Sequence, residues 1–156
     1  MTYAEFKSLT SGLLTGDNVL PQDADVLKGL VQYALTTVAT QAESLHLMTL
    51  STATDILRLG AGDYLIRTPN VPINDNDVID IDEELAFAVS RYLASYVSRE
   101  KGGIHVNAAD KIIKDYNAKT YEIIDKLNAD DLAAAALAAT NNTTFTPTVV
   151  GEDWYL

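Results

Sequence analysis

A run of carboxylates in the middle of the chain is the first feature that could do chemistry. Carboxylate oxygens are the ligands that calcium prefers, and a short loop rich in them could enclose the ion. The spacing does not match an EF-hand, because the turn position has no glycine and Ala86 stands where the closing glutamate belongs. We therefore expect a solvated acidic loop that leads into a capped helix, and we keep a calcium-dependent module as a weaker hypothesis. The calcium hypothesis depends on Asp75, Asp77, Asp80 and Asp82, and the run continues with Glu83 and Glu84.

Other catalytic or metal-binding chemistry has few candidate residues. The chain has no cysteine, which excludes disulfides, catalytic thiolates and cysteine-bound metals. The two histidines, His46 and His105, belong to no metal-ligand spacing, and we expect both in loops or at the surface without a catalytic role. Gly60-Ala61-Gly62 lacks the third glycine and the following helix of a dinucleotide-binding turn. We predict that the chain is not an enzyme and uses no cofactor and no metal.

The chain is strongly acidic, with 22 Asp and Glu against 11 Lys and Arg and a net charge of −11. Such a balance disfavours direct binding to phosphate backbones or to anionic membranes. It suits a protein that stays near DNA without adhering to it, although solubility is the plainer reason for the charge. No apolar run is long enough to cross a bilayer, and the N-terminus lacks the basic and apolar regions of a secretory signal. We therefore expect a soluble intracellular protein without membrane contact.

Four amphipathic stretches predict the helices that position these residues. Thr2 and Glu5 form a capping-box pattern, Pro21 suits the first position of the second helix, and Asp82 can cap the third. The apolar face of the second helix is so broad that we expect it to be buried on more than one side. We expect Gly102 to end the third helix. The third and fourth present facing apolar stripes, which predicts an antiparallel helical hairpin across a link centred on 103–106. The four stretches run over residues 2–15, 21–44, 82–101 and 107–127.

The remaining segments carry β and irregular patterns. Residues 45–72 lose helical spacing, and Ile56–Leu59 and Asp63–Arg67 flank a glycine-rich turn, so we expect a β-hairpin insert. Residues 128–156 read as a short alanine-rich helix followed by an extended C-terminal tail, which could reach a neighbouring subunit or fold back on its own core. The predicted fold class is mainly α, a four-helix bundle-like domain over 1–127 with a small hairpin insert and this tail.

Two stretches carry a resemblance to a known family. They are IDEELAFAVSRYLASYVSRE, residues 81–100, and AADKIIKDYNAKTYEII, residues 108–124. An acidic start, an alanine- and tyrosine-bearing helix and a second tyrosine-bearing helix resemble the head-to-tail connector proteins of tailed bacteriophages, also called neck or adaptor proteins. The resemblance covers the architecture of residues 1–127, whereas the alanine-rich segment that follows has no place in the family pattern.

The resemblance implies a structural virion protein, made in the host cytoplasm and located in the neck at the head–tail interface. It implies a ring of identical subunits, a dodecamer, that docks on the portal protein, supports the tail or a further neck protein, and lets DNA pass without specific binding. An acidic lumen would suit such passage. The candidate contact residues are Phe145, Trp154, Tyr155 and Leu156 in the tail, and Ile56, Leu57, Tyr64 and Ile66 in the hairpin.

A second hypothesis belongs to another class of protein. An acidic helical protein can regulate a basic protein by mimicking the charge of DNA. Self-association separates the two hypotheses, because a connector forms a high-order ring on its partner and a DNA mimic remains small.

Overall fold

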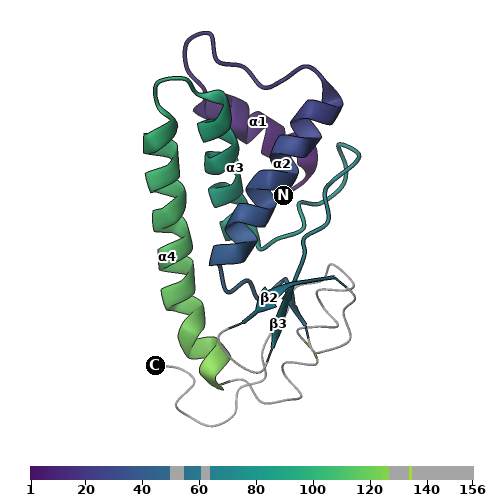
Figure 1. Ribbon diagram of the computed structural model, residues 1–156, viewed down its shortest axis with the longest axis vertical. Coiled ribbons are helices and arrows are strands. Elements are labelled where there is room, and N and C mark those ends of the chain that lie inside the picture. The colour runs from purple at the N-terminus through teal and green to yellow at the C-terminus, as the bar shows by residue number, and fades with distance from the viewer. Residues whose placement is uncertain (50–54, 61–63, 127–133, 135–156) are drawn as a thin grey trace.

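The computed structural model describes residues 1–49, 55–60, 64–126 and 134. Within these residues the protein is mainly α-helical, with a small antiparallel sheet at one end (Figure 1). Helix α3 lies at the centre, because α1, α2 and α4 all pack against it. The predicted mainly α fold is therefore confirmed. The elements are α1 (Tyr3–Leu13), α2 (Ala24–Gln41), β1 (Met48–Thr49), β2 (Ile56–Leu59), β3 (Leu65–Arg67), α3 (Glu83–Val97) and α4 (Gly102–Lys126).

Helix α1 begins at the predicted capping box. The Glu5 amide donates to the Thr2 hydroxyl at 3.3 Å, and the Thr2 amide donates to the Glu5 carboxylate at 2.7 Å. Both bonds satisfy amides that the first helical turn would otherwise leave without a partner. The helix ends slightly before the predicted boundary, because Leu14 is already extended and Gly16 turns the chain with a φ of 66°.

Helix α2 starts later than predicted. Asp23 is its N-cap, with a side chain that accepts hydrogen bonds from the amides of Asp25 and Val26 at 2.9 and 3.1 Å. Pro21 thus lies before the helix instead of at its first position. The helix starts after Asp23 because the Asp23 carboxylate accepts hydrogen bonds from the free amides of the first turn, which a proline side chain cannot do. The C-terminal end comes at Gln41, where Ala42 takes an extended conformation.

The central helical hairpin is confirmed as α3 and α4, but the position of the link is wrong. Helix α3 ends at Val97 and α4 begins at Gly102, so residues 103–106 are helical and the turn is 98–101. Gly102 starts a helix instead of ending one. A side chain there would come within 3.2 Å of the Ser95 carbonyl oxygen, so glycine allows the two helices to approach closely at the turn.

The sheet contains the predicted hairpin and one strand that the sequence did not reveal. Strands β2 and β3 pair antiparallel as expected, and β1 adds to the other edge of β3, giving the order β1-β3-β2. Arg58 of β2 joins this sheet to the end of α2, where its guanidinium donates to the carbonyl oxygens of Ala39 and Ala42 at 3.3 and 2.6 Å. A cation at the carboxyl end of a helix is electrostatically favourable, which explains why the sheet lies beneath α2.

One hydrophobic core joins the helices to the sheet. Phe6 of α1, Val31 and Val38 of α2, Ile66 of β3 and Leu93 of α3 are fully buried within it. The acidic loop is tethered to this core by Ile79 and Ile81, which are buried, whereas Val78 is exposed. None of the helices in the described part of the chain is long and apolar enough to cross a membrane.

Candidate functional site

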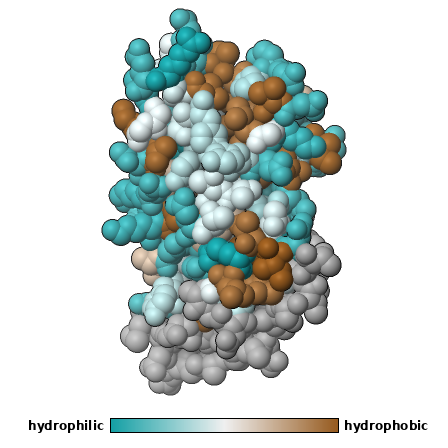
Figure 2. Space-filling model, viewed as in Figure 1, coloured by the Kyte–Doolittle hydropathy of each residue, from teal (hydrophilic) through white to brown (hydrophobic). Residues whose placement is uncertain are grey.

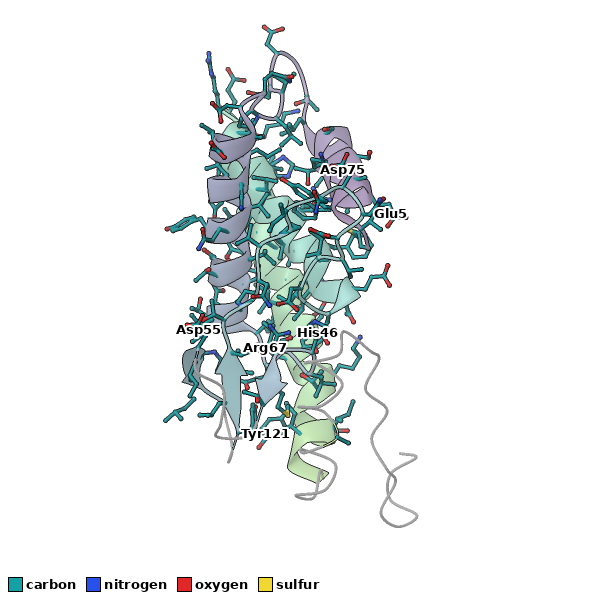
Figure 3. The ribbon with its side chains drawn as sticks, turned by 90° about the vertical axis from the view of Figure 1, so that its right-hand side faces the viewer. Glu5, His46, Asp55, Arg67, Asp75 and Tyr121 are labelled. Atoms are coloured by element: carbon teal, nitrogen blue, oxygen red, sulfur yellow. The ribbon has the colours of Figure 1, made fainter. Side chains whose placement is uncertain are left out.

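Asp80 of the acidic loop is the centre of a buried polar cluster. Its carboxylate accepts two hydrogen bonds from the Arg67 guanidinium, at 2.6 and 2.7 Å, and one from the Asn70 amide at 2.7 Å. The His46 ring lies 2.8 Å from the same carboxylate, and Figure 3 shows His46 and Arg67 side by side near the sheet. Burial alone would raise the pKa of Asp80, but the bonds from Arg67, His46 and Asn70 outweigh it and hold that pKa well below the ordinary value of a carboxyl group.

The other carboxylates of the loop have separate partners. Asp77 accepts from the amides of Ile73 and Asn74, both at 2.8 Å, which closes a tight turn. Asp75 pairs with Lys7 of α1 at 2.6 Å. Because each carboxylate serves a different contact, no group of three or more His, Asp or Glu side chains in the described residues could hold a metal ion. The geometry therefore offers no support for the calcium hypothesis.

The sequence suggested that the Asp82 side chain caps α3, but the structure shows no such cap. It occupies the N-cap position, but its carboxylate accepts from the Ser44 hydroxyl and from the His46 amide instead of from the helix. The Tyr116 hydroxyl accepts from the Leu45 amide nearby, at 3.1 Å. These bonds attach the segment after α2 to α3 and α4, so long-range contacts have replaced the local cap.

Both histidines are less exposed than predicted. His46 sits against Asp80 with only 17% of its side chain exposed, and His105 is buried on α4. The Arg91 guanidinium lies 3.2 Å from Nδ1 of His105, which therefore accepts the bond and leaves the ring neutral. Burial, with Arg91 and Lys101 nearby, lowers the pKa of His105. His46 lies in the segment between α2 and β1 and His105 lies on α4, so the two rings belong to separate contacts, and each has a packing role in the fold.

The hairpin residues proposed as contacts divide between the surface and the core. Ile56 is exposed and Leu57 packs against the core, whereas Tyr64 and Ile66 are buried, with 2% and 0% of their surface accessible. The expectation that Tyr64 and Ile66 face a partner is therefore corrected. Ile66 belongs to β3, the central strand, which has one face on the core, and Tyr64 is buried directly before this strand. Leu59 was missed and is the most exposed residue of β2, at 73%.

Helix α2 carries further exposed apolar side chains that the sequence interpretation did not name as contacts. Val26 and Tyr33 are 53% and 65% exposed, and the Tyr33 ring packs on Tyr96 of α3 with centroids 5.4 Å apart. Figure 2 shows pale, weakly polar surface over the lower half of α2 and a brown patch over β2 beneath it. The sequence predicted that the broad apolar face of α2 would be buried on more than one side, whereas Val26 and Tyr33 are exposed among the described residues. The breadth of that face was the signal for this surface.

The tail contacts Phe145, Trp154, Tyr155 and Leu156 lie outside the described residues, as does most of the alanine-rich segment. Comparison of the chain with protein-family models, curated proteins and solved structures finds no match. Function must therefore be argued from the surface and the buried contacts of this chain alone.

Proposed function

We propose that this chain is a structural virion protein, a head-to-tail connector that forms a ring between the portal and the tail and lets DNA pass through. The observation that carries the proposal is the apolar and weakly polar surface of α2 and β2 on a chain with a net charge of −11. A contiguous apolar patch, such as the one over β2 in Figure 2, is typical of a surface that contacts a partner.

The β2 edge of the sheet supports an assembly role. Among the described residues β2 pairs only with β3, and its Ile56 and Leu59 side chains are exposed. An edge strand with apolar side chains tends to pair with another chain. In a ring, each subunit could therefore present this edge to its neighbour, while the acidic residues of the other surfaces repel DNA in the lumen.

Negative-stain imaging of the purified chain, alone and mixed with the portal protein encoded beside its gene, tests the proposal. We expect rings of this chain stacked on the portal. A chain that stays small and does not bind the portal would refute the connector function.

The high acidic charge also favours a second candidate, a regulatory protein that binds a basic partner by mimicking DNA. In that case the chain would remain small and its binding would weaken steeply as salt is added, because the attraction is between opposite charges. Sedimentation of the chain with a basic DNA-binding protein from the same genome, at two salt concentrations, distinguishes this candidate from the connector.

A further inference from the structure

Helix α2 has a second apolar stripe apart from the one that faces the core. Its members are spaced alternately four and three residues apart, which is the spacing of the contact positions in a coiled coil. At about 100° per residue they lie on one side of the helix, whose middle is turned away from the core-facing side. We call the strip that they form the α2 seam, and its residues are Val26, Leu30, Tyr33, Thr37 and Thr40. Val26, Tyr33 and Thr40 are its exposed members, whereas Leu30 is half-buried against the core and Thr37 is half-buried beside Tyr96 of α3.

The two threonines of the seam are less polar than their type suggests. The Thr37 hydroxyl donates to the Tyr33 carbonyl oxygen at 2.8 Å, and the Thr40 hydroxyl donates to the Thr37 carbonyl oxygen at 2.8 Å. Each hydroxyl is thus satisfied by the backbone of its own helix. A helix packed against the seam would therefore not have to break a hydrogen bond that either threonine donates to water.

The helix around the seam has no charge along most of its length. Residues 29–42 include no Asp, Glu, Lys or Arg, although 21% of the whole chain is charged. Depletion of charge is typical of the centre of a protein–protein interface. Two copies with a net charge of −11 each would repel through their other surfaces, whereas they could meet along a strip without charge.

We infer that the α2 seam packs against a helix of a second copy of this chain. The choice of a second copy as the partner rests on the ring proposed above. The position and composition of the seam do not depend on that proposal. A basic partner would be attracted to the acidic loops instead of to this uncharged strip. The strip suits an uncharged helix surface, which α2 of a second copy provides.

The size of the seam sets the expected strength of the contact. Its residues span about 21 Å of helix, so it buries on the order of 200 Å² per subunit, well below the roughly 800 Å² of a stable interface. The isolated chain should thus associate only weakly, with a Kd in the millimolar range. Complete association should occur only where a template brings copies together.

A matched pair of cysteine variants tests where the contact lies. Since the chain has no cysteine, Thr40→Cys on the seam and Gln32→Cys on an exposed position off the seam can each carry one spin label. On raising the full-length protein from low micromolar to millimolar concentration, the label at 40 should lose mobility and the label at 32 should not. A label at 40 that stays mobile throughout would overturn the inference. So would one already immobile at low micromolar concentration, since the chain would then cover its own seam.

A matched pair of charge variants tests the chemistry. Tyr33→Glu should weaken self-association at least tenfold in sedimentation equilibrium, whereas Gln32→Glu should change it less than twofold. Added salt should strengthen the wild-type association, because it screens the repulsion between acidic copies. Equal effects of the two variants, or a weaker association at higher salt, would refute the inference that the seam mediates contact between copies.

The outcomes for the seam and for the connector function are distinguishable. Rings on the portal that form equally well from Tyr33→Glu would reject the seam and leave the connector standing. Self-association through the seam without any binding to the portal would keep the seam and reject the connector.

Discussion

Replacing Asp80 with asparagine should destabilise the fold by about 3 kcal/mol. Removing one partner of a buried ion pair costs roughly 3–5 kcal/mol, because the other charge then lies buried beside a neutral group. The side chains of Asp80 and Arg67 are 7% and 15% exposed, so the pair is close to this limit. Asparagine keeps one oxygen that can accept from Arg67, which places the cost at the lower end of the range. The melting temperature should fall by about 9 °C.

The same substitution should remove part of the acid sensitivity of the protein. The folded-state pKa of Asp80 lies below its unfolded value of about 3.9, so the unfolded chain takes up the proton first as the pH falls. The stabilisation by Asp80 is therefore fully present above the unfolded pKa and is lost as the pH drops toward the folded one. Asp80→Asn has no carboxyl group at this position, so its stability should fall less steeply below about pH 4.

Urea unfolding followed by circular dichroism, at neutral and at acidic pH, measures both effects. Asp75→Asn is the matched control, because the Asp75–Lys7 pair is exposed and should contribute less than about 1 kcal/mol. The double variant Arg67→Met/Asp80→Leu should regain part of the lost stability, since no buried charge remains at the pair, although the Asn70 amide and the His46 ring lose their acceptor. If Asp80→Asn cost no more than Asp75→Asn, the buried pair would not have the role assigned to it.

Three further predictions concern other parts of the fold. Thr2→Ala should lower stability by about 1 kcal/mol through loss of the α1 cap, measured by thermal denaturation; no change would show that the capping box is dispensable. The His105 ring should titrate below its ordinary pKa of about 6.5 in NMR, so stability should decrease as the pH falls through that value; a normal titration would contradict its burial. Leu59→Asp should leave the melting temperature almost unchanged but prevent ring formation on the portal, as seen in negative stain.

The elements with strong local signals were predictable from the sequence. The capping box of α1, the helical hairpin and the pairing of β2 with β3 depend on residues close together in the chain. The start of α4 was misjudged, because glycine was taken as a stop signal where close helix packing requires it. Strand β1 escaped notice because it is only two residues long, too short to show a period.

In the candidate site, too, local features were predictable from the sequence and contacts between distant segments were not. The sequence indicated exposed apolar residues on the hairpin, but not which strand would be buried. That depends on β1 covering the other edge of β3, a pairing between segments far apart in the chain. The acidic loop was expected to be solvated, yet Asp80 is buried because Arg67 and His46 come from β3 and from the segment after α2.

The sequence by itself determined the helical class, the acidic charge, the absence of cysteine chemistry and the apolar periodicity of α2, since composition and local spacing carry all of these. Only the tertiary structure decided which side of α2 enters the core and which side, with Val26 and Tyr33, remains exposed. It alone also paired Asp80 with Arg67. The physical reason is that burial and charge pairing depend on where distant segments meet, and local patterns do not contain that information.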